Sequence, residues 1–203
     1  MKPHLKKGVF YRLMCWYDAW WRRQHKVEKF DELISFSLEP FTGERRQLND
    51  GSWIEPGDTL AILHFNRECF SADDEAENAS QNNPPVNKNN NYMRNALRFR
   101  KLIFASLAQL ANDIHQHEKL LQVKAFHGIS WLPPHGEKFG FLIEKLPDTT
   151  LTRIRKYYFR LLLNAFFPQV AARESQRIEP HAYWLSRQNL LKYFLRESAQ
   201  HES

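Results

Sequence analysis

The sequence has few cysteines and no long apolar run. Cys15 and Cys69 match no metal-ligand spacing, and a single possible disulfide would be weak evidence for secretion. The longest apolar stretch, "LLLNAFF", is far shorter than a membrane span. The N-terminus begins like a signal peptide, but Arg12 and Asp18 interrupt its apolar run and no small-residue cleavage site follows. We therefore expect a cytoplasmic protein, in contact with the inner membrane at most peripherally.

Several functional motifs are also missing from the sequence. It contains neither G-x-G-x-x-G nor G-K-[ST], so no glycine-rich phosphate loop is predicted. It contains no EF-hand and no H-E-x-x-H pattern, and we expect neither a metal nor a cofactor. No helix-turn-helix, zinc-finger or RNP motif is present, so nucleic-acid binding rests on charge alone.

What the sequence does have is positive charge and many aromatic rings. The net charge is +6, the pI is about 9.3, and six tryptophans and fifteen phenylalanines are present. This balance suits an anionic partner such as nucleic acid, a lipid headgroup or a phosphorylated ligand. A basic protein with no such partner would show the same composition, so both interpretations stay open.

Hydrophobic periodicity predicts helices over 8–29, 92–118 and 149–167, and a last helix capped by Ser186. Strands are predicted near 33–41, 59–66, 121–130 and 138–146, the last two as an antiparallel pair. Residues 71–91 are low-complexity and predict a disordered loop within a single domain, 1–203. Because helices and strands do not alternate strictly, we predict an α+β fold. It would have one mostly antiparallel sheet, with an N-terminal aromatic helix and three further helices packed on it.

Three elements carry specific burial patterns. Strand 33–41 alternates apolar and polar residues, so one face should be buried. The helix at 149–167 should turn its apolar residues inward. The N-terminal helix gathers aromatic residues on one face, flanked by arginines, and could pack across a sheet or lie in a membrane interface. The residues expected inside are Ile34, Phe36 and Leu38 of the strand, and Leu151, Ile154, Tyr158, Leu161 and Leu162 of the later helix. The aromatic face of the N-terminal helix consists of Phe10, Leu13, Met14, Tyr17, Trp20 and Trp21.

Histidines near strand ends are the candidates for chemistry. His64 ends the apolar strand 59–66, and His127 lies near the end of strand 121–130. If those strands are neighbours, both histidines could meet Asn66 and Ser130 at one sheet edge. A histidine beside a serine is the minimum for an activated nucleophile. A hydrogen-bonded structural role is the alternative for each of these residues.

Two basic stripes are the candidates for anion binding. Arg94, Arg98 and Lys101 share one face of the helix at 92–118. Arg153, Lys156 and Arg160 share one face of the helix at 149–167. If the stripes face each other they could hold a phosphate, and otherwise they are solvated surfaces.

The stretch "DGSWIEPGDTLAILHFN" (50–66) resembles the D-G-x-x-I-x-x-G-D-x-x-x-x-L-H-x-x-N pattern of the bacterial YkoP-like domain. The resemblance continues in "FRKLIFASLAQLA", "VKAFHGISWL", "FGFLIEKLP" and "YWLSRQNLLKYF". Asn66 stands one residue earlier than in that pattern, so no role carries over to it. The family has no established mechanism, and it is sometimes attached to polysaccharide deacetylase domains. This association implies a cell-envelope setting.

Three functional hypotheses follow. The first is a non-catalytic accessory domain that binds an anionic envelope precursor, a lipid surface or an envelope-biosynthesis protein. The second is a hydrolase or transferase in which His64 and His127 act as acid and base, assisted by Ser130 and Asn66. The third is nucleic-acid binding through the basic helices.

Overall fold

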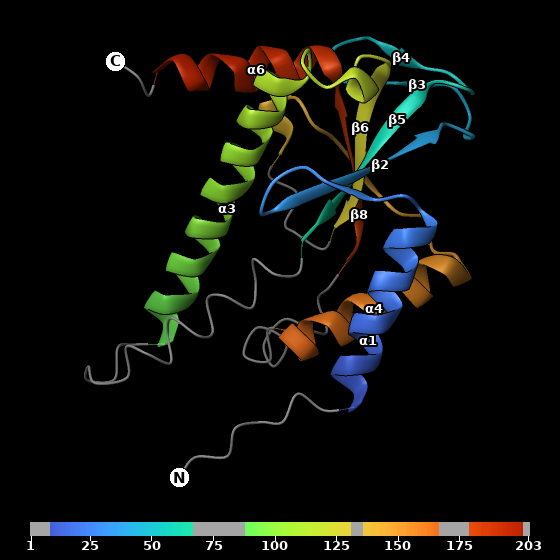
Figure 1. Ribbon diagram of the computed structural model, residues 1–203, viewed down its shortest axis with the longest axis vertical. Coiled ribbons are helices and arrows are strands. Elements are labelled where there is room, and N and C mark those ends of the chain that lie inside the picture. Colours follow the sequence, from blue (N-terminus) through green and yellow to red (C-terminus); the bar gives the residue numbers. More distant parts are fainter. Residues whose placement is uncertain (1–8, 67–87, 131–135, 167–178, 201–203) are drawn as a thin grey trace.

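The computed structural model describes residues 9–66, 88–130, 136–166 and 179–200. Four α-helices, eight strands and two short 3-10 helices lie within these ranges (Figure 1). The helices are α1 (Val9–Gln24), α3 (Lys88–Asp113), α4 (Thr150–Phe166) and α6 (Arg187–Gln200). The strands are β1 (Glu28–Lys29), β2 (Ile34–Pro40), β3 (Arg46–Gln47), β4 (Trp53–Ile54), β5 (Thr59–Phe65), β6 (Val123–Ser130), β7 (Leu142–Lys145) and β8 (His181–Ser186).

Six strands form one sheet in the order β1-β2-β5-β6-β8-β7, and β3 with β4 forms a separate hairpin. The β5–β6 pair is parallel and the other pairs are antiparallel. The predicted α+β class with a mostly antiparallel sheet is therefore confirmed. The most apolar strand, β5, lies in the interior of the sheet.

One predicted pairing is wrong. The strands at 121–130 and 138–146 do not pair with each other, because β8 lies between β6 and β7. No strand was predicted at the position of β8, whose residues come about fifty positions after β6. The turn signals between the two predicted strands suggested a hairpin, but the space between them is filled by this later strand.

Helix boundaries also differ from the prediction. α1 ends at Gln24, and Lys26 takes a positive φ of 48° before β1 begins. α3 starts at Lys88, so the end of the predicted loop at 71–91 forms its first turn, whereas residues 71–87 lie outside the described part of the chain. The predicted cap of the last helix is confirmed, since the backbone N–H of Asn189 donates to Ser186 Oγ at 2.9 Å.

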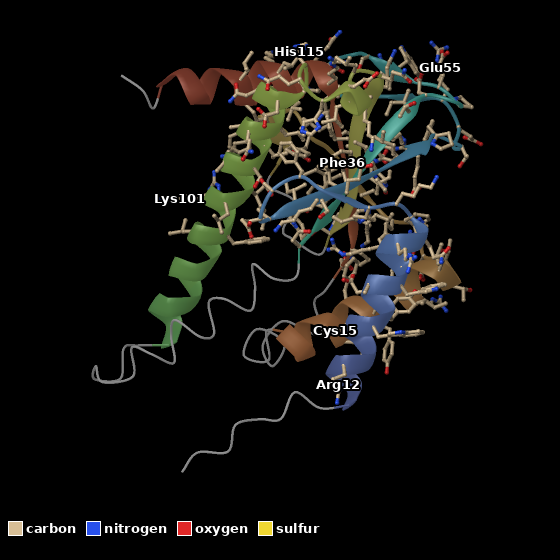
Figure 2. All side chains as sticks on the ribbon, in the orientation of Figure 1. Arg12, Cys15, Phe36, Glu55, Lys101 and His115 are labelled. Carbon is tan, nitrogen blue, oxygen red and sulfur yellow. The ribbon has the colours of Figure 1, made fainter. Side chains whose placement is uncertain are left out.

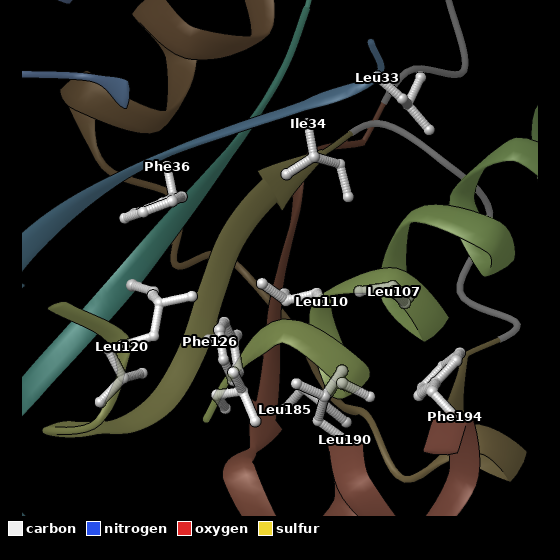
Figure 3. Packing of buried hydrophobic residues seen from close by; sticks show 14 residues of the cluster. Leu33, Ile34, Phe36, Leu107, Leu110, Leu120, Phe126, Leu185, Leu190 and Phe194 are labelled. Atoms are coloured by element: carbon white, nitrogen blue, oxygen red, sulfur yellow. The ribbon is translucent and has the colours of Figure 1, made fainter. Parts of the chain in front are cut away.

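The two faces of the sheet have different coverings. The face that α3 and α6 cover is called the α3 face. It carries Phe36, Ala61 and Phe126, which pack against these helices in the main hydrophobic cluster (Figure 3). The α1 face is the opposite one and carries His64 and His127. Part of the α1 face packs under the β3–β4 hairpin in a second cluster, and its other part meets α1.

Several residues differ in burial from the sequence patterns. In β2 the serines of the alternate face are buried too, because α1 covers them, whereas Leu38 is 37% exposed. On α4, Leu151 and Ile154 point outward instead of inward. On α1, Tyr17 and Trp20 are exposed, whereas the Trp21 ring contacts the sheet through His64.

Two glycines with positive φ provide a stability prediction. Gly51 and Gly140 both have φ +82°, but a Cβ on Gly140 would lie 2.7 Å from Asn189 and from the Tyr193 ring, whereas one on Gly51 would meet nothing within 4 Å. Gly51→Ala should cost about 1 kcal/mol of unfolding free energy from backbone strain alone. Gly140→Ala should cost about 2–4 kcal/mol, since the clash adds to that strain. Equal losses in urea denaturation would contradict this account.

Candidate functional site: two neutral histidines beneath three arginines

Two of the predicted histidines stand on the α1 face near the ends of neighbouring strands. β5 and β6 run parallel, and Ile62 is the register partner of His127. Side chains alternate along a strand, so His64, two residues beyond Ile62, shares the face of His127. Strand spacing and rise place the Cα atoms of the two histidines roughly 8 Å apart. The structure therefore brings His64 and His127 together, as the sequence suggested for neighbouring strands.

His64 is half-buried beneath α1. Its Nε2 lies 3.2 Å from Ser37 Oγ. The Trp21 ring meets the imidazole edge-on, with 5.0 Å between centroids. Burial, followed by the positive charge of Arg22, lowers the pKa of His64 from 6.5 to about 4. The imidazole is therefore neutral at pH 7.

His127 is fixed by a stacked ring and a backbone carbonyl. Its imidazole stacks on Trp184 with centroids 3.8 Å apart, and its Nδ1 lies 3.1 Å from the Tyr183 carbonyl oxygen. A carbonyl only accepts, so the proton is on Nδ1 and Nε2 carries a lone pair. Burial is the largest cause that lowers the pKa of His127 to about 4, and the charges of Arg46 and Arg155 add to it.

Arg22 joins α1 to the end of the sheet. Its Nε donates to Asp18 on the same helix at 3.1 Å. One terminal nitrogen donates to Ser35 Oγ at 3.2 Å and to Asn66 Oδ1 at 3.1 Å, and the other donates to the Phe65 carbonyl at 3.2 Å. These contacts explain why a serine of β2 and an asparagine after β5 are buried.

Asn66 has a structural place in this arrangement. Its Oδ1 also accepts from Ser35, and its Nδ2 donates to the Asp31 carbonyl at 2.8 Å. Its backbone N–H donates to the Leu33 carbonyl at 2.7 Å. The side chain therefore holds the loop before β2 and the guanidinium of Arg22.

The other two arginines come from the β3–β4 hairpin and from α4. Arg46 forms an ion pair with Glu144 and lies over the Trp184 ring, 4.7 Å from its centroid. The Trp184 indole N–H also donates to Glu144, at 3.1 Å. Arg155 is half-buried, and no acidic side chain of the described residues pairs with it. Within the described part of the chain, its charge therefore has no carboxylate partner.

The low pKa values of the two imidazoles limit their use as general bases at pH 7. The best general base has a pKa near the working pH, and imidazoles with pKa values of about 4 are weak bases at pH 7. Ser37, the serine beside His64, is 1% exposed and cannot meet an external substrate. Among the described residues, no three His, Cys, Asp or Glu side chains gather as a metal site.

Ser130 stands apart from the histidines. It is three residues from His127 on β6, so the two side chains point to opposite faces of the sheet. Ser130 lies on the α3 face, where it is the register partner of His181 in the neighbouring strand β8. The structure therefore brings His64, His127 and the Asn66 region to one side and places Ser130 on the other.

The two predicted basic stripes are not joined into one site. α3 packs on the α3 face, whereas α4 places Arg155 near His127 on the opposite face. Figure 2 shows Lys101 on α3, away from Arg12 on α1. The side chains of Arg94 and Arg98 lie outside the described part of the chain.

On α4 the predicted stripe has mixed environments. Arg153 is exposed and forms two 3.1 Å hydrogen bonds with Asp148. Lys156 and Arg160 are half-buried. Arg155 was not predicted from the sequence. It lies between the stripe residues, and its charge acts on His127 together with that of Arg46.

The other missed residues are Arg22, Arg46 and Ser37. Only one signal in the sequence could have found any of them: the i, i+4 spacing of Asp18 and Arg22, which predicts an ion pair but not its position over the sheet. Arg46 comes from a two-residue strand, whose packing depends on distant residues.

The Asp50–Gly51 turn at the start of the quoted stretch serves the fold. Asp50 accepts from Ser186 Oγ at 2.5 Å and from Ser52 Oγ at 2.6 Å. Burial opposes ionisation of Asp50, but these hydrogen bonds together hold its pKa below the ordinary value of 3.8. The turn thus supports the cap of α6, on which Ser186 also accepts from Asn189.

Comparison with known proteins agrees with the resemblance seen in these segments. The family model described as the YkoP domain matches residues 7–194 of the 203. No curated protein and no solved structure matches the chain. The matched range includes α1, the sheet, both histidines and the start of α6. The chain belongs to the YkoP domain family.

Proposed function

We propose that this domain is a non-catalytic, cytoplasmic accessory domain that binds an anionic group of a cell-envelope ligand. The binding site is the region of the α1 face around Arg155, His127 and His64. The observation that carries the proposal is Arg155, which has no carboxylate partner among the described residues and whose charge acts on the neutral, partly accessible imidazole of His127, next to His64. A phosphate or carboxylate would accept from the guanidinium in a charge-assisted hydrogen bond.

The histidines would respond to such a ligand. Positive neighbours help to keep His127 neutral, so an anion beside it would offset their charge and raise its pKa. A protonated Nε2 would then donate to the ligand. Anion binding is therefore coupled to proton uptake, and the affinity should increase as the pH falls from 7 towards 5.

The expected effect of Arg155→Gln is at least about a tenfold loss of affinity for pyrophosphate, the worth of one charge-assisted hydrogen bond. Arg153→Gln is the matched control, because Arg153 lies on the same helix and its guanidinium is already held by Asp148. Affinity is measured from the histidine ring signals in an NMR titration.

Equal affinity of the Arg155 and Arg153 variants would place the anion elsewhere. Unchanged ring signals of both histidines in the unsubstituted protein, up to high pyrophosphate concentration, would overturn the proposed site.

A further inference from the structure

α1 has an inner side and an outer side of different composition. Arg22 and Trp21 point inward, to the end of β5 and to His64. On the outer side Trp16 is 65% exposed, and Tyr17 and Trp20 are also exposed. Arg12 and Arg23 are exposed and stand four residues before Trp16 and three after Trp20. Three large aromatic rings between two arginines are thus turned away from the fold.

α4 repeats this pattern. Its exposed apolar residues are Leu151, Ile154 and Tyr157, at three-residue steps along the helix, and Tyr157 is 64% exposed. Twelve large hydrophobic side chains are exposed among the described residues, and six of them lie on α1 and α4. Both helices lie by the same end of the sheet in Figure 1, and their arginines act on the same histidine pair.

The positive charge of the chain is concentrated in the same two segments. Residues 9–26 and 148–161 contain eight Arg and Lys against two Asp, an excess of six that equals the net charge of the whole chain. The two acids, Asp18 and Asp148, are each paired with an arginine of their own segment. The rest of the protein is therefore neutral overall. The exposed cations of these segments, Arg12, Arg23, Lys26 and Arg153, lie in the same two segments as the exposed rings.

We propose that the outer sides of α1 and α4 form a membrane-docking surface that lies on an anionic bilayer. Tryptophan and tyrosine favour the membrane–water interface, where the ring is shielded and its polar atom stays wet. The flanking arginines and lysines meet the headgroup phosphates, as in interfacial amphipathic helices. None of the described helices has the length and hydropathy of a membrane span, so the docking surface would hold the domain from one side.

Charge favours the bilayer over a second copy of the chain. A symmetric dimer through this surface would bring two segments of the same positive excess together, and like charges repel. A small soluble anion would satisfy the arginines but would leave Trp16 and Trp20 in water. An anionic bilayer satisfies both the charge and the exposed rings. The exposed rings and exposed arginines of this surface are not residues of the histidine site, so this inference goes beyond the proposed function.

The test is flotation of the full chain with vesicles of phosphatidylcholine alone and of phosphatidylcholine with phosphatidylglycerol. The protein should float with the anionic vesicles only, and retention should weaken with added salt. Trp16→Ala with Trp20→Ala should lower retention at least about tenfold. Trp53→Ala is the matched control, because Trp53 is exposed on β4, outside the docking surface.

No retention of the protein on anionic vesicles would overturn the inference. An equal loss of retention in the Trp53 variant and in the Trp16 and Trp20 double variant would overturn it too. Concentration-dependent dimerisation that the Trp16 and Trp20 changes abolish, without vesicle binding, would assign the surface to self-association instead. Binding of a nucleic-acid duplex without binding of vesicles would also overturn the inference. The pyrophosphate response of His127 is measured on the same variants. A normal response shows that they are folded, and it separates failure of docking from failure of the anion site.

Discussion

Replacing Phe126 with alanine is expected to lower the free energy of unfolding by about 3–5 kcal/mol. Phe126 is 1% exposed and lies in the middle of the sheet on the α3 face, within the main hydrophobic cluster. β6 is flanked by β5 and β8, so the backbone has little freedom to close the cavity that the missing ring would leave. Most domains have only about 5–15 kcal/mol of stability, so this variant should be close to unfolding.

Leu38→Ala is the matched control in urea denaturation. Leu38 lies on β2 and belongs to the alternating set predicted as buried, but its side chain is 37% exposed. Its loss should therefore change stability by about 0.5 kcal/mol or less. A loss for Phe126→Ala below about 1 kcal/mol would contradict the position of the core on the α3 face.

The second large effect is a loss of stability in mild acid. The pKa values of His64 and His127 are about 4 in the folded protein, against about 6.5 in an unfolded chain. Between these values the unfolded chain binds more protons, so stability is full above about pH 6.5 and falls as the pH decreases towards 4. Each histidine should contribute about 2–3 kcal/mol of this loss by pH 4.

The measurement is urea denaturation at a series of pH values from 7 to 4.5. The double variant His64→Asn with His127→Asn should have a much flatter pH dependence, whatever its absolute stability. His115→Asn should keep the slope of the unsubstituted protein, because His115 is exposed. An equally steep slope in the double variant would show that other groups cause the acid sensitivity.

Local patterns in the sequence were sufficient for the elements whose ends are set by local chemistry. The Asp50–Gly51 and Pro56–Gly57 pairs are typical turn sequences that delimit β4 and β5, and Gly51 and Gly57 both adopt a positive φ. The cap at Ser186 depends on a hydrogen bond to a residue three positions later. Such features need no knowledge of the tertiary structure, and the Ser186 cap was predicted from the sequence.

Features set by distant contacts were missed. β8 separates β6 from β7, and no turn signal near either strand indicates an inserted partner. In β2, Ser35 and Ser37 alternate with apolar residues and therefore suggested a solvated face. α1 covers that face, and Arg22 supplies the hydrogen bond that makes burial of Ser35 tolerable.

The candidate site shows the same division. His64 and His127 could be placed near each other once their strands were assumed to be neighbours, because strand alternation fixes the face of each side chain. Arg155 could not be chosen from the stripe of α4, since only the docking of that helix decides which arginine turns to the sheet. No local pattern around Asn66 indicates that its side chain would accept a hydrogen bond from Arg22, 44 residues earlier in the chain.

The most direct test of the proposed site is the pKa of His127, measured by NMR with and without saturating pyrophosphate. In the free protein the account predicts a pKa of about 4, because the ring is buried and two arginines lie near it. With the anion bound, the pKa of His127 should rise clearly towards its ordinary value of 6.5, and Arg155→Gln should diminish that rise. An identical pKa in the presence and absence of pyrophosphate would contradict the anion site.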